Sequence, residues 1–538
     1  MVQAQKRAKV TDQLAQIRYT LPYVSQSALA AIINWARVHD LPDVCSTREI
    51  RKARDDASAN ISTCYGPLLV EHDFAHADDD LFTKIELLNP FSMLFHMFET
   101  SKFFRDCMEH ILASHGPCLP TNPLELILYS DEVTPGNQLA HKNKRKVQTI
   151  YFSFAEFGEL LKYDELWVTC TVVACTEVAK IQGGWSAVVA VVVKQFFSPS
   201  DPSQHMTEGG ISLRLPDGQR LWLFVSFGWQ LSDELAASLQ VYCSKGANGL
   251  KPCKWCCNVF DHKTVRASVF SDPWAVTHDE PNIRKFVMHT PDTLAKIIAD
   301  LKHTAETRGG GALSALATAM GYSYEPHGIL FDPYLFQLVE PTEHSIPDPM
   351  HVLYVNGMVN HHVGRMFYEM RFTTFTYASA YEFCTQWTWP AALGSSVHTG
   401  VEALSSSRAA ASLAAQNFKA SASELRSLVP VLSYFAAETL KRSCTLTDKQ
   451  KEQLQCFLLL SVVLQEYEAG CRGYCDLDRM ESHLQLHMES FVRLLGETGI
   501  GCMVGQRGGT GEDAHVHHDF KNDSSMQHAM QHAMQHDE

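Results

Sequence analysis

LELILYSDEV, at residues 124–133, is an apolar run that ends in two acids and begins the part of the chain that decides the fold. Two further runs rich in β-branched and aromatic residues follow it, KVQTIYFSFAEF at 146–157 and LWVTCTVVAC at 166–175. Such runs, separated by short polar segments, are typical of β-strands. GWSAVVAVVVKQFF at 184–197 starts after Gly183 and is long enough for a buried helix despite its valines. The pattern therefore predicts a three-strand meander followed by a crossover helix.

A fourth strand and an inserted hairpin are expected next. ISLRLPDGQRLWLFVSF at 211–227 holds two strand-like runs around a Pro-Asp-Gly turn, and DELAASLQVYC at 233–243 then opens a helix. The order β-β-β-α-β is how a ribonuclease-H-like mixed sheet begins. In such a sheet the fourth strand lies parallel to the first, so we expect Asp131 and Asp233 to approach each other across adjacent strands.

Outside this core, apolar residues recur at helical spacing, for example at 90–115, where Asn89 or Ser92 is the expected cap. Beyond residue 501 the pattern is lost, and the chain ends in Met-Gln-His repeats that we expect to be disordered. The sequence thus predicts an α/β protein with four parts: an N-terminal helical region at 1–120, a ribonuclease-H-like core with a cysteine element at 121–285, a large helical insertion at 286–500 and a tail at 501–538.

Composition narrows the class of protein. The net charge of −15 argues against a surface built wholly for nucleic acid, although a local basic groove is compatible with it. No window is apolar enough for a membrane helix, so we expect no membrane partner. The 16 cysteines, several close to one another and without a secretion signal before them, are expected to be reduced thiols in the nucleus or the cytoplasm.

Two acidic motifs are candidates for a catalytic site. Asp131 ends an apolar strand, and a carboxylate there can ligate Mg²⁺ or Mn²⁺, although aspartate is also common in plain turns. Asp348 and His351 form an Asp-x-x-His step that would place both side chains on one side of a helical turn. The alternative there is an aspartate that caps the helix and a histidine in the core.

Two further motifs point to phosphate and zinc. One is a basic run that contains Lys142, Lys144, Arg145 and Lys146. We expect it to contact DNA phosphates or to act as a nuclear-import signal. The alternative is a solvated hairpin tip. Cys253 and Cys256 have the spacing of a zinc knuckle, and Cys257, Cys243 or His262 could complete tetrahedral coordination. Idle or buried thiols are the alternative for these cysteines.

The joint order of these motifs resembles one family. SDEVTPGN, KNKRKVQTIYFSF, IQGGWSAVV, SDELAASLQ, KGANGLKPCKWCCN and PDPMHVLYVNG follow one another as in DDE transposases of the CACTA (Tnp2-like) and Kyakuja, Dileera and Zisupton groups. The resemblance covers about residues 120–360 and, more loosely, the helical region after it. It implies that Asp131 and Asp233 are the metal-binding acids and that Asp348 and His351 are the family's Asp-x-x-His step.

The implied reaction is metal-dependent cleavage of DNA phosphodiester bonds followed by strand transfer. The family's third acid is a glutamate that lies beyond a basic, His-rich stretch after the helical region, and this chain has no counterpart of either after Gly496. Glu481 and Glu489 are the only nearby substitutes for that glutamate, and surface positions on an amphipathic helix explain them equally well. We therefore expect a truncated, catalytically inactive transposase derivative that acts on DNA, with a homo-oligomer as a further possibility. The alternatives are a DNA-binding relic without chemistry and a zinc-stabilised interaction scaffold; a Cys/His hydrolase is weaker, since no nucleophile setting is evident.

Overall fold

The computed structural model is a mixed α/β protein. It describes residues 61–77, 80–133, 146–215, 217–232, 240–261, 274–277, 280–355, 357–389, 400–471, 473–474 and 476–502. The chain divides into two compact units, each made of several segments. The first contains Met1–Leu126, Thr134–Gln182 and Val191–Phe227; the second contains Ile127–Val133, Gly183–Ala190 and Gly228–Glu538.

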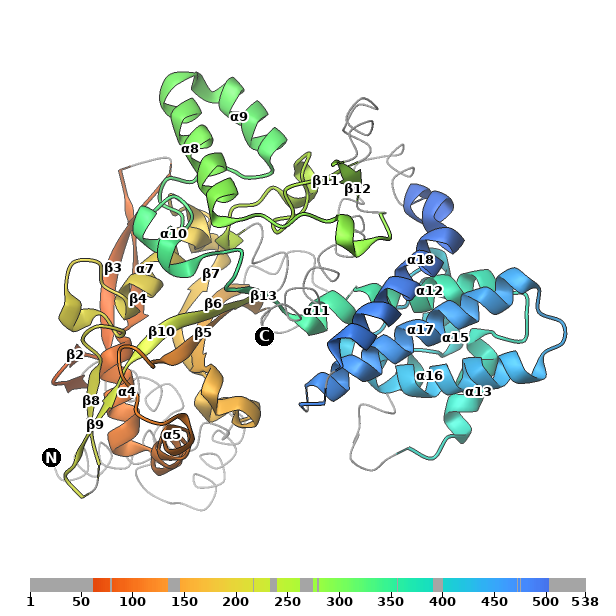
Figure 1. The fold of residues 1–538 in the computed structure, drawn as a ribbon, viewed down its shortest axis with the longest axis horizontal. Coiled ribbons are helices and arrows are strands. Elements are labelled where there is room, and N and C mark those ends of the chain that lie inside the picture. Colours follow the sequence, from red (N-terminus) through yellow and green to blue (C-terminus); the bar gives the residue numbers. More distant parts are fainter. Residues whose placement is uncertain are drawn as a thin grey trace, which may run out of the picture. The chain divides into compact units, whose positions relative to one another are not determined.

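Five strands form one sheet, in the order β13-β10-β5-β6-β7 (Figure 1). β6 and β7 pair antiparallel and β10 and β13 pair parallel. The amide of Leu124 donates to the carbonyl of Phe224 at 2.9 Å, so β5 and its neighbour β10 begin side by side and run in the same direction. The predicted strands are confirmed as β5 (Leu124–Val133), β6 (Val147–Phe154), β7 (Val168–Ala174) and β10 (Val225–Ser232).

The fifth strand, β13 (Ser345–Pro347), corrects the sequence analysis, which predicted a helical region over 286–500. Its three residues pair with Gln230, Leu231 and Ser232 of β10. A strand this short, ending in a proline, carries no periodicity that a sequence pattern can detect. Because the pairing is made to a strand more than a hundred residues earlier, β13 is a product of tertiary structure.

Helix α7 (Gly184–Phe196) is the crossover helix that the sequence predicted. It begins at Gly183 and Gly184, which both have positive φ, a conformation that glycine adopts without strain. Four of its five valines are buried, as expected for a helix packed against other elements, and Val191 is half-buried. At its first turn the indole N–H of Trp185 donates to the hydroxyl of Ser130 at 2.7 Å.

The first unit differs from the predicted helical region, because residues 62–88 form strands. β3 (Leu69–Ala75) and β4 (Phe82–Leu88) pair antiparallel along their whole length. Helices α4 (Pro90–Thr100) and α5 (Lys102–His115) follow as predicted. Asn89 caps α4, accepting from the amides of Phe91 and Ser92, whereas Ser92 itself is buried and donates to the carbonyl of Gly66 at 2.7 Å.

The predicted hairpin is present as β8 (Ile211–Arg214) and β9 (Arg220–Leu223), which form a separate two-stranded sheet. The predicted second run of this hairpin is divided at Phe224, and its continuation is β10. The remaining short elements are β1 (Ser62–Thr63), β2 (Gly66–Pro67), α6 (Cys175–Val178), β11 (Val259–Phe260), β12 (Val276–Thr277) and 3₁₀ turns at Ala155–Lys162, Asp164–Leu166, Pro202–Gln204, Gly246–Asn248 and Ile283–Lys285.

The second unit continues into a helical region, as predicted. Its helices are α8 (Pro291–Thr307), α9 (Gly309–Met320), α10 (Pro333–Val339), α11 (Pro349–Leu353), α12 (Met358–Met370), α13 (Tyr377–Gln386), α15 (Ser406–Ala415), α16 (Ala422–Arg442), α17 (Asp448–Gly470) and α18 (Leu477–Cys502). Capping boxes begin α16 at Ser421 and α17 at Thr447, and these satisfy amides that a helix start leaves free. One continuous apolar core joins α11 to α18.

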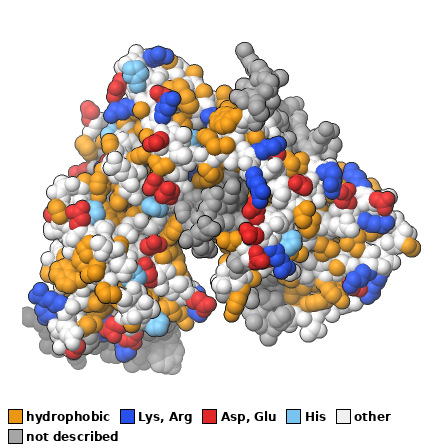
Figure 2. Space-filling model, in the orientation of Figure 1, with side chains coloured by type: hydrophobic (Ala, Val, Ile, Leu, Met, Phe, Trp, Pro, Cys, Tyr) orange, Lys and Arg blue, Asp and Glu red, His pale blue; other side chains and the backbone are white. Residues whose placement is uncertain are grey.

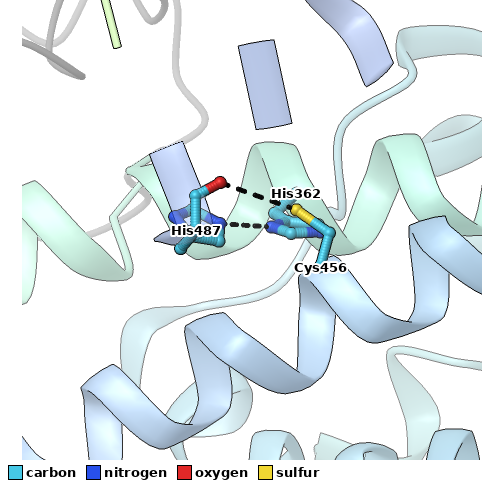
Figure 3. Close-up of side chains that lie close together, drawn as sticks. All are labelled: His362, Cys456 and His487. Atoms are coloured by element: carbon cyan, nitrogen blue, oxygen red, sulfur yellow. Dashed lines mark hydrogen bonds between the residues drawn. The ribbon is translucent and has the colours of Figure 1, made fainter. Parts of the chain in front are cut away.

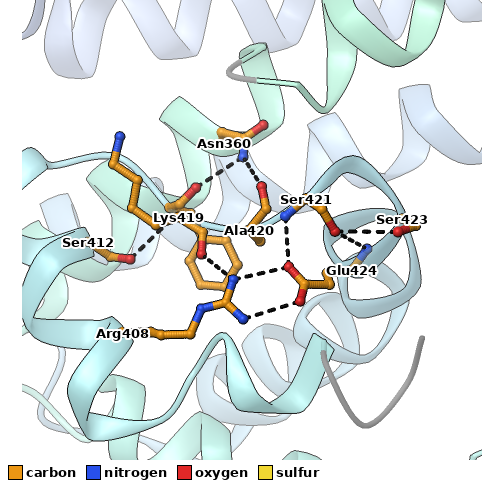
Figure 4. A network of polar contacts seen from close by, with 9 residues as sticks. Asn360, Arg408, Ser412, Lys419, Ala420, Ser421, Ser423 and Glu424 are labelled. Atoms are coloured by element: carbon orange, nitrogen blue, oxygen red, sulfur yellow. Dashed lines mark hydrogen bonds and ion pairs between the residues drawn. The ribbon is translucent and has the colours of Figure 1, made fainter. Parts of the chain in front are cut away.

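A polar network fixes the link between α15 and α16 onto α12 (Figure 4). Asn360 accepts from the amide of Phe418 at 3.0 Å and donates through its side-chain amide to the carbonyl of Phe418, also at 3.0 Å. Arg408 forms a bidentate ion pair with Glu424, at 3.2 and 3.0 Å, and also donates to the carbonyl of Lys419 at 2.8 Å. These contacts hold residues 417–424 in one conformation against the helices.

The stability that the Arg408–Glu424 ion pair contributes is expected to depend on pH. Burial alone would raise the pKa of Glu424, but hydrogen bonds from Arg408 and from the amide of Ser421 outweigh it, so the pKa of Glu424 lies below its usual value. A carboxylate whose pKa is lowered by folding stabilises the protein above its unfolded-state pKa of about 4.3, and this contribution is lost as the pH falls through the folded-state pKa. We expect Glu424→Gln to lower the free energy of unfolding by roughly 1–3 kcal/mol at pH 7, because Arg408 loses its charged partner.

Denaturant unfolding at pH 7 and below pH 4 would measure this effect, and the difference between wild type and Glu424→Gln should shrink at the lower pH. Glu438→Gln on the same helix is the matched control. Its partners Lys441 and Arg442 are exposed, and ion pairs with exposed cations contribute little to the free energy of unfolding. If both variants lost the same free energy of unfolding, the Arg408–Glu424 pair would have no special stabilising role.

Candidate functional site

Two acids named by the sequence analysis, Asp131 and Asp348, lie near the ends of strands β5 and β13. Asp131 is a half-buried residue of β5, seven residues after Leu124, and Leu231 is seven residues after Phe224 in β10. Since β5 and β10 start together and run in the same direction, Asp131 lies beside the end of β10. The predicted Asp233 follows Ser232, the last residue of β10, and its own placement is outside the described residues.

Asp348 lies at the same sheet edge. It follows β13 directly, and its amide donates to the carbonyl of Ser232 at 3.0 Å. One carboxylate oxygen, Oδ1, accepts from the amide of Met350 at 2.8 Å and caps the short helix α11. Asp348 therefore makes the helix cap that the sequence analysis gave as the alternative to an Asp-x-x-His site. The side chain of His351, one turn later in α11, is outside the described part of the structure.

The first turn of α7 contacts Ser130, the residue before Asp131. Ser130 and Trp185, which hydrogen-bond each other, are both buried. Ser186 donates to the carbonyl of Val241 at 2.6 Å and accepts from the amide of Ile329 at 2.9 Å. Because these bonds satisfy buried polar groups, they give the residue before Asp131 a fixed environment.

The cysteine element forms a second cluster. Cys253 and Cys256 are buried, and the amide of Cys256 donates to the sulfur of Cys253 at 3.4 Å. Burial raises the pKa of the Cys256 thiol, and the nearby thiols of Cys253 and Cys257 raise it further. Cys257 is half-buried, and its thiol donates to the carbonyl of Val287 at 3.2 Å. The three thiols are thus neighbours, as the Cys-x-x-Cys spacing suggested.

His289 joins this cluster and was not predicted. Its amide donates to the carbonyl of Trp255 at 2.6 Å, and burial lowers the pKa of its ring to about 4, against the opposing effect of Cys253. Nδ1 hydrogen-bonds Thr293 at 3.0 Å, which leaves Nε2 as the nitrogen for any ligand. His262, the predicted companion of the cysteines, is outside the described residues. Of the predicted basic run, Lys142, Lys144 and Arg145 are also outside them, and Lys146 lies just before β6.

A third cluster lies in the helical region and was missed by the sequence analysis. His362 of α12, Cys456 of α17 and His487 of α18 are all buried, and their ligand atoms lie within 4.8 Å of one another. This group could hold a metal ion. The three residues lie far apart in the sequence on three different helices, so no spacing rule marks them.

Comparison with known proteins adds no assignment: no protein-family model matches this chain, and neither does any curated protein. Among the described residues, no helix is both long enough and apolar enough to cross a membrane. What remains to indicate a function is the three clusters, the sheet that carries Asp131 and the order of the motifs along the chain.

Proposed function

We propose that this chain is a transposase-derived protein whose core descends from an enzyme that cleaves DNA phosphodiester bonds. The observation that carries the proposal is the sheet order β13-β10-β5-β6-β7, in which the first strand of the meander is central and lies between β6 and the parallel strand β10. A ribonuclease-H-like core has this strand order. The order supports the resemblance of the motifs, because it brings the position of Asp131 to the end of the strand that precedes Asp233.

The acids at this edge fit Mg²⁺ or Mn²⁺, because both ions prefer carboxylate oxygens and accept water and phosphate as further ligands. Asp131 and Asp233 would hold the ions, which supply charge stabilisation for the oxygens that attack and leave phosphorus. Ser130, held by Trp185, fixes the strand from which Asp131 projects. The DNA would be held by phosphate contacts from Lys142, Lys144, Arg145 and Lys146, and such a protein would act in the nucleus.

The two glutamates nearest to the expected position of the third acid, both among the described residues, are engaged in other contacts. Glu481 pairs with Arg284 at 3.1 Å, and Glu489 accepts from Gln485 at 2.8 Å, so both behave as ordinary side chains of α18. Asp348 is at the right edge of the sheet, but one of its oxygens caps α11. We therefore propose that the present chain binds metal and DNA without efficient cleavage.

Metal binding and nicking of supercoiled plasmid by the full chain test this proposal. Bound Mn²⁺, measured by electron paramagnetic resonance, should be lost in Asp131→Asn and in Asp233→Asn. Glu132→Gln is the matched control, because successive residues of a strand point to opposite faces. We expect no nicking above the level of the two aspartate variants. Metal-dependent nicking that Asp131→Ala abolishes would overturn the inactivity, and Mn²⁺ binding unaffected by both variants would overturn the site.

A zinc-stabilised interaction protein is the second candidate, and the charge distribution favours it. On the face drawn in Figure 2, lysines and arginines are interspersed with acids and do not gather into one basic surface. In the helical region Arg426 pairs with Glu468 and Arg479 with Glu466. Zinc retained by Cys253 and Cys256 in a chain without salt-dependent affinity for DNA would select this function.

A further inference from the structure

Three helices of the second unit meet at a cluster of two histidines and a cysteine (Figure 3). His362 on α12, Cys456 on α17 and His487 on α18 expose 3%, 2% and 0% of their surface, so bulk water is excluded from them. The rings of Phe457 and Phe491 pack against the ring of His362, with centroids 5.7 and 5.3 Å away. The cluster is therefore a small polar site enclosed by apolar side chains.

The two ring nitrogens have nearly the spacing of two ligands in a tetrahedral metal site. Nδ1 of His362 and Nε2 of His487 are 3.1 Å apart. Two nitrogens bound to Zn²⁺ at about 2.0–2.1 Å in tetrahedral geometry are roughly 3.3 Å apart. The sulfur of Cys456 points to the same place, since it lies 3.8 Å from the carbonyl oxygen of His487 and close enough to both rings to share one ion. Little rearrangement is needed to place an ion among the three atoms.

The chemistry of the donors also suits zinc. Two imidazole nitrogens and one thiolate form a ligand set that is typical of Zn²⁺ and poorly matched to Mg²⁺ or Ca²⁺, which prefer oxygen. Burial lowers the pKa of both rings, so their lone pairs are not protonated at neutral pH. Burial also raises the pKa of the Cys456 thiol to about 12, so binding of the ion would release one proton from sulfur.

We propose that His362, Cys456 and His487 bind one Zn²⁺ ion that cross-links α12, α17 and α18. The site goes beyond the proposed function, because it does not involve the sheet, the strand-edge acids or DNA. Three protein ligands leave one tetrahedral position for a water molecule. The site is structural: each ligand comes from a different helix, so the ion stabilises the packing of this region wherever the native state binds it and the unfolded chain does not.

Cobalt substitution of the full chain tests the site, because Co²⁺ bound by thiolate gives a charge-transfer absorption band. We expect Cys456→Ser to lose the part of this band that the site contributes, while Cys384→Ser keeps it. Cys384 is the matched control because it is another buried thiol of the same helical region. Saturating Zn²⁺ should also raise the midpoint of thermal unfolding of wild type and of Cys384→Ser by at least about 5 °C, and not that of Cys456→Ser.

His487→Gln provides an independent test, since it keeps the thiol and removes one nitrogen. It should lose the same part of the cobalt band as Cys456→Ser, and circular dichroism should show that both variants remain helical. The comparison separates this site from Cys253 and Cys256, whose contribution to the band is unchanged in both variants. A band undiminished in Cys456→Ser and His487→Gln, or zinc that raises no unfolding midpoint, would overturn the proposal and leave a hydrogen-bonded pair of core histidines.

Discussion

Replacing Phe367 by alanine is expected to lower the free energy of unfolding of the helical region by about 3–5 kcal/mol. The Phe367 side chain is fully buried on α12, and its ring stacks on Tyr377 at 4.2 Å and on Phe375 at 5.1 Å between centroids. Removing the ring takes away both stacking partners and leaves a cavity that the surrounding helices can fill only in part.

Denaturant unfolding followed by far-UV circular dichroism would measure this loss. Phe372→Ala is the matched control, because Phe372 lies five residues further along the chain and is 87% exposed. We expect its effect to stay within about 0.5 kcal/mol, as for most surface substitutions. If the two alanine variants were equally stable, the packing described for α12 would be wrong.

The second large effect is expected for Gly364→Ala, which should cost about 3 kcal/mol although alanine is the better helix former. A methyl group at this position would overlap the backbone of Asn417 and Phe418, which cannot rotate away as a side chain would. Gly364 is one helical turn after Asn360, which binds the same segment. Asn360 and Gly364 therefore form one contact surface on α12. The absence of a side chain at Gly364 allows the backbone of Asn417 and Phe418 to approach the helix closely.

Gly311→Ala on α9 is the control for helix propensity. Gly311 is exposed, and a methyl group there would meet no atom within 4 Å. Because alanine loses less entropy than glycine in a helix, this variant should be unchanged or more stable by up to about 1 kcal/mol. Thermal unfolding should thus show a clearly lower midpoint for Gly364→Ala and an equal or higher midpoint for Gly311→Ala. If Gly311→Ala were destabilised as well, steric overlap at Gly364 would not be the cause of its loss.

The parts of the fold that were predictable are those whose signal is local. β5, β6, β7 and α7 each carry a run rich in apolar, β-branched or aromatic residues that is long enough to indicate a strand or a helix. β3 and β4 were missed because their residues are mostly polar or partly exposed, as in LVEHDFA. β13 was missed because three residues become a strand only when Gln230 to Ser232 are there to pair with them.

The candidate sites divide in the same way. Asp131 and the Cys-x-x-Cys pair could be predicted because their signals are local. Asp131 lies at the end of an apolar strand, and Cys253 has a second cysteine three residues later. His289 reaches the cysteines only through the bend that pairs its amide with Trp255. His362, Cys456 and His487 are buried positions of three helices, and periodicity identifies such positions as core without saying which of them meet.

The late position of β13 has a consequence for how the protein is made. Ser345 emerges from the ribosome 113 residues after Ser232, which is roughly 6–23 seconds at about 5–20 residues per second. During that interval the end of β10, from Gln230 to Ser232, lacks its native partner. An unpaired strand edge is a template for pairing with other chains. Nascent chains, and fragments that stop before residue 344, should therefore depend on chaperones to avoid aggregation at this edge.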